Sequence, residues 1–412
     1  MSDREIRKTL GGVTAAKGFT AASTAAGIKY QGREDMAFIF SEEPCECAGT
    51  FTRNKVKAAC VKWDMDLVAS GKKLHGVVIN SGIANACTGE KGYDACRKTA
   101  EAVARVKGVG ADSVAVASTG VIGMHLPVEK LEKGVEDMAA LLSHDIEAGT
   151  KASKAIMTTD TVNKEMAVSF MIAGKEVTLG GMSKGSGMIH PDMCTMLSFI
   201  TTDIDIERGL LQKAVSEVID DTFNMITVDG DTSTNDTFMI LANSLAGNKK
   251  IESEDEDYEH FKKALFTVCR YLARTMASDG EGATKLFEAR VLNASSKEDA
   301  RKLGRAVVGS NLSKAAIFGC DANFGRFLCA MGYSGADFKE EDVELFFESR
   351  EGRLKVFDHG VPLDFDEDEA VKIMKAPEVS VVIDMNEGEY SADAWGCDLT
   401  YDYVKINADY RS

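Results

Sequence analysis

The sequence predicts a layered α+β fold in which helices cover β-sheets, and three observations lead to this prediction. Apolar runs of strand length are interspersed with longer stretches in which apolar residues recur every three or four positions. Their order lacks the regular strand–helix–strand alternation of a doubly wound parallel sheet. The 412 residues, 44% of them hydrophobic, also suffice for two or three domains or for one large two-lobed unit.

Short apolar runs predict buried strands, because each run ends in small or polar residues. These runs are residues 75–81, 113–118 and 197–200. Two other stretches predict hairpins. Residues 166–179 turn at 173–175, and residues 379–407 alternate apolar and polar positions in two runs around 386–388.

Longer stretches predict amphipathic helices, because their apolar residues are three and four positions apart and therefore share one helical face. The predicted helices are residues 93–107, 128–142, 206–223, 260–276 and 297–308.

The charge balance argues against several kinds of partner. Lys and Arg number 48 against 65 Asp and Glu, which gives a formal net charge of −17. Such a surface repels phosphate backbones and anionic lipids, so we expect no nucleic-acid partner and no membrane partner. No apolar run reaches the roughly 18 residues that a membrane-spanning helix needs.

The cysteines and the first residues indicate a cytoplasmic protein. The ten cysteines include no C-x-x-C pair, so we expect mostly reduced, buried thiols and no zinc site. The segment 1–8 carries acidic residues and fits neither a signal peptide nor a basic transit peptide. We expect no metal, nucleotide or other cofactor.

A glycine-dense stretch, residues 180–187, stands directly before the apolar residues 193–197. Residues 181–185 match the G-x-S-x-G pattern of a hydrolase nucleophile elbow. An elbow needs a helix after the serine, and Gly185, Gly187 and Pro191 oppose one. The same glycines lack the ending of a phosphate-binding loop, so neither motif is expected to function here.

Two interpretations of Thr195 remain open on chemistry alone. In the first, a tight loop enters a buried strand and the Thr195 hydroxyl is an inert core group. In the second, Thr195 is a nucleophile. A threonine hydroxyl needs a base, and its own free amine provides one if the bond before Thr195 is cut.

Several blocks of the sequence carry a resemblance. Residues 182–189, Pro191 and residues 193–197 resemble the processing-site motif of the ornithine acetyltransferase (ArgJ) family, the glutamate N-acetyltransferases of the cyclic arginine pathway. Other blocks in family order span nearly the whole chain. They are residues 11–15, 80–82, 84–89, 118–123, 158–161, 228–236, 279–285, 318–323 and 407–411.

The resemblance implies the family's layered α+β fold and an autoprocessed acetyl carrier without a cofactor. The bond between Cys194 and Thr195 would be cut, giving an α chain, 1–194, and a β chain, 195–412. Thr195 would then take the acetyl group from N-acetylornithine and pass it to glutamate by ping-pong kinetics. The pieces are expected to stay together in an α2β2 assembly.

The resemblance also assigns site residues. Thr119 and Gly120 match the oxyanion-stabilising pair, and Lys184 matches a lysine that attracts a substrate carboxylate. The other substrate-binding matches are Thr158, with Thr159 as a near alternative, Glu281, Asn407 and Ser412, besides Thr195 itself.

Two positions depart from the family pattern, and two rival functions remain. Cys194 stands where alanine is expected and Ser412 where threonine is expected, and both residues are small. One rival is an amidase or aminopeptidase with the same amino-terminal nucleophile, in which water takes the acyl group. The other is an unprocessed amino-acid-binding protein. The sequence leaves open whether acetyl-CoA is also an acetyl donor.

Overall fold

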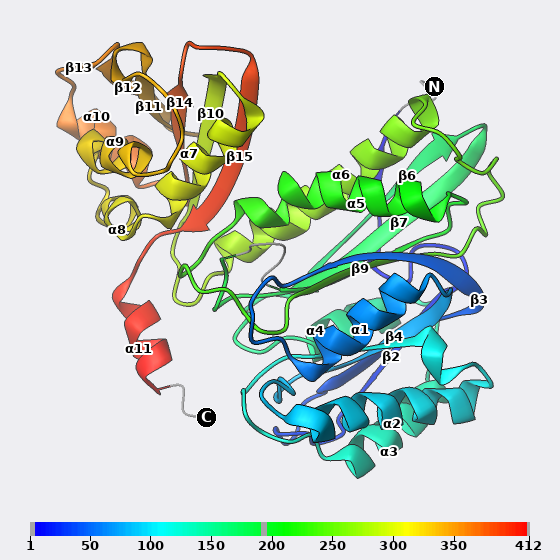
Figure 1. The fold of residues 1–412 in the computed structure, drawn as a ribbon. Helices are drawn as coiled ribbons and strands as arrows, with labels where there is room; N and C mark the ends of the chain where they lie inside the picture. The colour runs from blue at the N-terminus through cyan, green and yellow to red at the C-terminus, as the bar shows by residue number, and fades with distance from the viewer. Residues whose placement is uncertain (1–4, 191–195, 410–412) are drawn as a thin grey trace.

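The computed structural model describes residues 5–190 and 196–409 and contains two β-sheets with helices packed against them (Figure 1). One sheet has nine strands and the other has six. This arrangement confirms the predicted layered α+β fold. No helix of the described residues is long and apolar enough to cross a bilayer.

The larger sheet has the strand order β1-β6-β7-β8-β9-β3-β4-β5, with β2 paired to β3. Its strands are β1 (Arg7–Thr9), β2 (Phe19–Thr24), β3 (Met36–Phe51), β4 (Leu74–Asn80), β5 (Val114–Ser118), β6 (Lys164–Ile172), β7 (Lys175–Lys184), β8 (Leu197–Thr202) and β9 (Thr237–Ala242). Most neighbours are antiparallel, but β8 pairs with β9 and β4 pairs with β5 in parallel.

The long strand β3 belongs to both halves of this sheet. Its residues 36–40 pair with β2 and β4, whereas residues 46–51 pair with β9. The pairing with β4 shifts register between Phe40 and Cys45. One cluster contains Ile39 of the first half together with Phe199 and Met239 of β8 and β9, so the two half-sheets share an inner core.

Helices cover the outer faces of both half-sheets. Phe38 and Phe40 point away from the inner core into a cluster with α1, α2 and α3, because successive strand residues face opposite sides. On the other side, α5 and α6 pack over β3, β6 and β7 (Figure 1). A further helix, α4, packs on β2 and β3. The bounds of the six helices are α1 (Ala59–Ser70), α2 (Gly89–Lys107), α3 (Val128–Ala139), α4 (Ile146–Ala155), α5 (Arg208–Asp220) and α6 (Glu256–Ser278).

The smaller sheet has the order β13-β12-β11-β14-β10-β15 and forms the upper left part of Figure 1. Its strands are β10 (Leu286–Ala294), β11 (Glu344–Ser349), β12 (Gly352–Asp358), β13 (Val361–Pro362), β14 (Glu378–Asp384) and β15 (Tyr390–Cys397). The later helices are α7 (Lys297–Gly309), α8 (Asn311–Gly319), α9 (Phe324–Gly332), α10 (Glu367–Met374) and α11 (Tyr401–Asp409).

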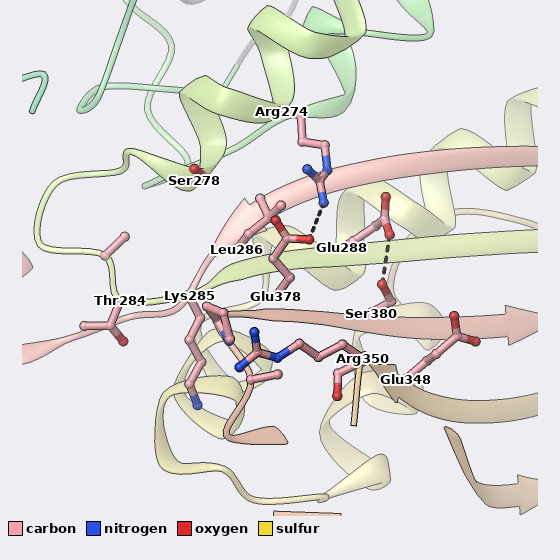
Figure 2. Close-up of a pocket in the computed structure, with 14 residues that line it drawn as sticks. Arg274, Ser278, Thr284, Lys285, Leu286, Glu288, Glu348, Arg350, Glu378 and Ser380 are labelled. Carbon is pink, nitrogen blue, oxygen red and sulfur yellow. Dashed lines mark hydrogen bonds and ion pairs between the residues drawn. The ribbon is translucent and has the colours of Figure 1, made fainter. Parts of the chain in front are cut away.

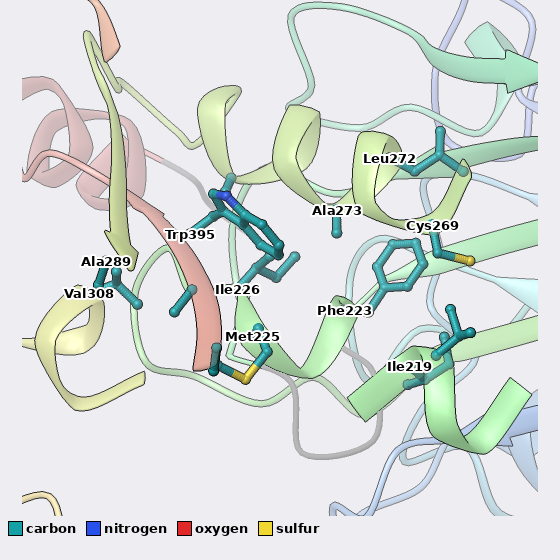
Figure 3. Packing of buried hydrophobic residues seen from close by; sticks show 14 of the residues in the cluster. Ile219, Phe223, Met225, Ile226, Cys269, Leu272, Ala273, Ala289, Val308 and Trp395 are labelled. Carbon is teal, nitrogen blue, oxygen red and sulfur yellow. The ribbon is translucent and has the colours of Figure 1, made fainter. Parts of the chain in front are cut away.

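One apolar cluster joins the two sheets (Figure 3). Trp395 of β15 is fully buried and shares this cluster with Phe223, Ile226 and Ala273. Its indole N–H donates a hydrogen bond to Glu288 over 2.8 Å, so the buried polar atom is satisfied. The larger and smaller sheets therefore share a continuous core.

Most predicted elements are confirmed, and one is wrong. Strands β4, β5 and β8, helices α2, α3, α5, α6 and α7, and the β6–β7 hairpin lie where the sequence places them. The predicted hairpin at 379–407 is wrong, because β10 lies between β14 and β15 and pairs with both. The last part of that stretch forms the helix α11 in place of the expected strand.

Candidate active site

One pocket contains all the described residues to which the sequence gives a site role. Its volume is about 160 Å³. Its lining residues are Thr119, Gly120, Thr158, Thr159, Lys184, Gly187, Met188, Ile189, Met196, Leu197, Ser233, Asn235, Asp236, Glu281 and Asn407. The pocket lies at one end of three central strands, where Lys184 is opposite Leu197 and Leu197 is opposite Thr237.

The turn after β5 places Thr119 and Gly120 against the segment after β4. Thr119 N–H donates to the Asn80 carbonyl over 3.0 Å, and Val121 N–H donates to the Gly82 carbonyl over 3.1 Å. Gly120 has φ +130°, and a Cβ there would lie 2.2 Å from the Gly82 carbonyl carbon. Only glycine permits this backbone packing, so the position of the Gly120 N–H is fixed by the fold.

Asn235 holds the same turn from a third segment. Its buried side-chain amide donates to the carbonyls of Ala84 and Ser118 over 2.5 and 2.8 Å. Ser118 Oγ donates in turn to Asn80 Oδ1 over 2.7 Å. Thr119 therefore follows a strand end that is anchored on both sides.

A buried charge network supports three of the pocket-lining segments. Lys164 Nζ lies 2.8 Å from Asp160 and 2.6 Å from Asp279, and the side chains of Lys164 and Asp160 are completely buried. Asp160 also accepts hydrogen bonds from the backbone N–H groups of Thr158, over 3.1 Å, and Gly185, over 2.7 Å. One carboxylate thus orients the segments that carry Thr158 and Lys184.

Lys184 is the last residue of β7. Among the described residues that line the pocket, it is the one with a cationic side chain. Its side chain is 9% exposed, and Nζ lies 4.0 Å from Asp160 Oδ2. Burial alone would raise the pKa of Asp160, but the charges of Lys184 and Lys164 outweigh it and hold that pKa below its ordinary value. Lys184 therefore faces the pocket beside an ionised carboxylate, at a distance that leaves its ammonium available to another anion.

Glu281 reaches the pocket from the loop between α6 and β10. Its N–H donates to the Ser186 carbonyl over 3.0 Å, and Ser186 Oγ donates to the Asp279 carbonyl over 2.6 Å. A Cβ on Gly187 would lie 2.3 Å from Glu281 Cδ, so glycine makes room for this carboxylate. Asn407 of α11 donates to Glu281 Oε2 over 2.8 Å.

The loop after β7 is fixed by residues that the sequence analysis did not select. Asp229 accepts from the N–H groups of Met188 and Ile189 over 2.6 and 2.8 Å. His190, to which the sequence assigns no role, contacts Thr227 Oγ1 and Arg305 over 3.1 and 3.2 Å. The sequence feature that could have identified Asp229 as a site residue is its position in the family block 228–236.

Three predicted site positions lie outside the described residues. They are Thr195, Cys194 and Ser412. The described residues 190 and 196 bracket the first two, and Met196 and Leu197 line the pocket.

The G-x-S-x-G match does not form a nucleophile elbow. Ser183 lies inside β7, and its buried hydroxyl donates to Ser198 Oγ over 2.8 Å. Residues 185–190, the described residues directly after β7, form bends and an isolated bridge and no helix. This agrees with the sequence argument from the following glycines.

A larger cavity, of about 760 Å³, lies away from the predicted site residues, beside β10, β11 and β14 (Figure 2). Its charged side chains are paired with one another or with neighbours: Arg274 with Glu378 at 2.7 Å, and Glu288 with Ser380 at 2.8 Å. Lys285 Nζ donates to the carbonyls of Ile317 and Met374. We therefore place the candidate active site in the smaller pocket, where the functional groups converge.

Two carboxylates and a histidine form a cluster of metal-ligand types among the described residues. Single ligand atoms of Glu344, Asp358 and His359 lie within 4.8 Å of one another at the surface. Lys355 Nζ lies 3.1 Å from Glu344 and 2.5 Å from Asp358, so a lysine already compensates these charges.

The class of protein that these features define is a layered α+β protein with a polar, preorganised pocket at the end of its central strands. The sequence model of the ArgJ family matches residues 20–412. A relative from Caldanaerobacter subterraneus subsp. tengcongensis, named arginine biosynthesis bifunctional protein ArgJ, is 50% identical over 396 residues, 96% of this chain and 97% of that protein. The chain belongs to the ArgJ family.

A second relative agrees with this assignment. The protein of the same name from Bacillus subtilis is 44% identical over 412 residues, 100% of this chain and 99% of its own length. A crystal structure of ornithine acetyltransferase in complex with ornithine, from Mycobacterium tuberculosis, is 43% identical with a TM-score of 0.43. The match covers 47% of this chain and 100% of that one.

Proposed function

We propose that this chain transfers the acetyl group of N-acetylornithine to glutamate, giving ornithine and N-acetylglutamate in arginine biosynthesis. The observation that carries the proposal is the convergence of Thr119, Gly120, Lys184, Glu281 and Asn407 on one pocket beside residue 196. The names of the relatives and membership of the ArgJ family support the same activity.

Thr195 is the proposed nucleophile. Cleavage between Cys194 and Thr195 gives the α piece, 1–194, and the β piece, 195–412, and frees the amine that activates the Thr195 hydroxyl. Met196 and Leu197, which follow Thr195 in the sequence, line the pocket. Acetylation of Thr195 releases ornithine, and glutamate then removes the acetyl group.

The other pocket residues have distinct proposed roles. The Thr119 hydroxyl and the Gly120 N–H stabilise the oxyanion of each tetrahedral intermediate, and their rigid packing suits this task. Lys184 binds the substrate carboxylate. Glu281 and Asn407 bind the polar end of the substrate, a task that the resemblance also gives to Thr158, with Thr159 as the alternative, and to Ser412.

The word bifunctional in the relatives' names supports a second activity. We propose acetyl-CoA as a second acetyl donor, because a thioester can acetylate the same threonine and glutamate can take the group from the same intermediate. The measurement is formation of N-acetylglutamate from acetyl-CoA and glutamate without N-acetylornithine.

An α2β2 assembly in the cytoplasm completes the proposal. Strand β7 of the first piece pairs with β8 of the second, and β3 pairs with β9, which supports a lasting association of the two pieces. The described cysteines are free thiols, as a reducing compartment requires.

The experiment is the intact mass of the purified chain under denaturing conditions, followed by a transfer assay. Cleavage before Thr195 divides 44.4 kDa into pieces of about 21 and about 23 kDa in proportion to their lengths. Thr195→Ala should leave a single chain without transfer activity. Release of ornithine that depends on glutamate separates this enzyme from a hydrolase, and a fully active Thr195→Ala variant would refute the mechanism.

A further inference from the structure

A second carboxyl group lies in the pocket that Met196 and Leu197 line, and the roles assigned above do not include it. Asp236 is 1% exposed yet lines the pocket. Its Oδ2 atom has no hydrogen-bond partner among residues 5–190 and 196–409. A buried polar atom without a partner is costly and calls for an explanation, of which a catalytic role is one.

The sheet places Asp236 next to the start of β8. Strands β8 and β9 run parallel with Leu197 opposite Thr237, so Asp236 precedes β9 as Met196 precedes β8. Thr237 N–H donates to the Met196 carbonyl over 2.8 Å, which fixes the two strand entrances side by side. The backbone of Asp236 is held from the other side, because its carbonyl accepts from Thr52 N–H over 3.0 Å.

The surroundings of Asp236 favour its neutral, protonated form. Burial raises the pKa of Asp236 well above its ordinary value. The hydroxyls of Ser233 and Thr52, the charge of Lys184 and the Met196 N–H act in the opposite direction but do not outweigh burial. A carboxyl group of this kind can donate a proton at neutral pH.

We propose that Asp236 is a further catalytic residue, which gives a proton to the amine nitrogen leaving N-acetylornithine and takes a proton from the glutamate amine that attacks the acetyl-enzyme. The inference rests on the proposed function, because it assigns the proton transfers of that reaction.

The proton balance closes over the two half-reactions. In the first, the Thr195 oxygen bonds to the acetyl carbon and its proton passes to the Thr195 amine. The amide C–N bond breaks, and the leaving nitrogen takes the Asp236 proton. In the second, the glutamate nitrogen bonds to the acetyl carbon and returns a proton to Asp236. The ester C–O bond then breaks, and the Thr195 oxygen recovers its proton from the ammonium.

The test compares two acetyl donors in Asp236→Asn, which keeps the side-chain volume but cannot exchange the proton. An amine needs a proton in order to leave, whereas the p-nitrophenolate of p-nitrophenyl acetate does not. We expect acetylation of the enzyme by N-acetylornithine to slow by about 10²- to 10⁴-fold, with the rate from p-nitrophenyl acetate unchanged within a few-fold.

Asp64→Asn is the matched control. Asp64 is completely buried, has an unpartnered Oδ2 among the described residues, and accepts a hydrogen bond from Val116 N–H over 2.9 Å away from the pocket lining. We expect it to keep both acetylation rates. Equal loss with both donors in Asp236→Asn, or an Asp236→Asn chain that stays uncleaved while Asp64→Asn is cleaved, would overturn the inference.

A second measurement needs no variant. In the wild-type enzyme the ratio of acetylation rates, saturating N-acetylornithine over p-nitrophenyl acetate, should fall as rising pH deprotonates Asp236. Protonation of the Thr195 amine slows acetylation by both donors and therefore cancels in this ratio. The charge of Lys184 acts on Asp236, and saturating N-acetylornithine removes the effect of Lys184 on substrate binding. A ratio that rises with pH would overturn the inference.

The two hypotheses fail in different ways. A wild-type enzyme that N-acetylornithine does not acetylate would refute the proposed function and this inference with it. Acetylation at equal rates in the wild type and Asp236→Asn would refute the inference alone.

Discussion

The side-chain amide of Asn407 donates a hydrogen bond to Glu281 over 2.8 Å, and this contact joins α11 to a loop 126 residues earlier in the chain. The same amide donates to the Tyr403 carbonyl over 3.0 Å, within its own helix. Glu281 is therefore held by two separate segments, the loop after β7 through the Ser186 carbonyl and the last described helix.

Replacing Asn407 with alanine should weaken substrate binding without affecting chain cleavage. Loss of one hydrogen bond of about 0.5–1.5 kcal/mol corresponds to a KM increase of about two- to tenfold. Steady-state kinetics with N-acetylornithine measure the change. Val404→Ala, at a 64% exposed position of the same helix, should leave KM unchanged, and equal effects of the two variants would contradict the predicted contact.

Lys184→Ala should reduce substrate use more than stability. The variant removes the pocket cation, while Asp160 keeps its partner Lys164 at 2.8 Å. We expect kcat/KM for N-acetylornithine to fall by about 10²-fold, since charged contacts to a substrate contribute about 1.5–3 kcal/mol. Lys175→Ala, at the exposed start of the same strand, is the control. Collapse of the fold in Lys184→Ala would instead indicate a structural role.

Lys164→Met should be strongly destabilising. It leaves Asp160 and Asp279 as buried carboxylates without their shared cation, and breaking a buried pair in this way costs about 3–5 kcal/mol. Urea unfolding followed by circular dichroism measures the loss. Lys133→Met removes a pair whose lysine side chain is 67% exposed and should change stability by less than about 1 kcal/mol. Similar losses in the two variants would rule out the network as a source of stability.

Gly187→Ala should displace Glu281. The new Cβ would lie 2.3 Å from Glu281 Cδ, the end of a side chain that can move, so the cost falls on the site more than on the fold. We expect kcat/KM to fall by up to about 10²-fold, with little change in the unfolding midpoint. In Gly319→Ala no heavy atom lies within 4 Å of the new Cβ, so that variant should retain full activity.

Asp64→Asn should gain stability relative to the wild type as pH rises. Burial raises the pKa of Asp64, so the folded chain keeps its proton while the unfolded chain ionises above about pH 4. Ionisation of the unfolded state favours unfolding, by up to about 1.4 kcal/mol per pH unit until the folded pKa is reached. Asparagine does not titrate. Urea unfolding at about pH 5 and about pH 7 measures the difference, and a difference independent of pH would contradict the prediction.

Local patterns predicted individual elements well and their long-range pairing poorly. The alternation in 379–407 correctly marks β14 and the start of β15, but alternation does not identify a strand's partner. Strand β10, about 90 residues earlier, supplies the partner for both through a parallel and an antiparallel ladder. The turn-like residues 386–388 lead between the two strands without making them neighbours.

The candidate active site shows the same contrast between what local patterns predict and what only the fold brings together. Family blocks gave residues that converge on one pocket, whereas Asp160, Lys164 and Asp236 were not selected. Asp160 and Asp236 lie inside the blocks 158–161 and 228–236, but only the fold shows that they are buried among charged or reacting groups. Lys164 lies outside every block, and an isolated lysine in a sequence ordinarily indicates a solvated surface.

The pairing of β7 with β8 and of β3 with β9 has a thermodynamic consequence if the bond before Thr195 is cut as we propose. Folding of the intact precursor is unimolecular, because all strands of the larger sheet belong to one covalent chain. After the cut, each piece lacks strands that the other supplies, so refolding becomes a bimolecular association whose midpoint depends on protein concentration. Synthesis as one chain therefore lets the sheet form at an effective concentration that two separate polypeptides would not reach.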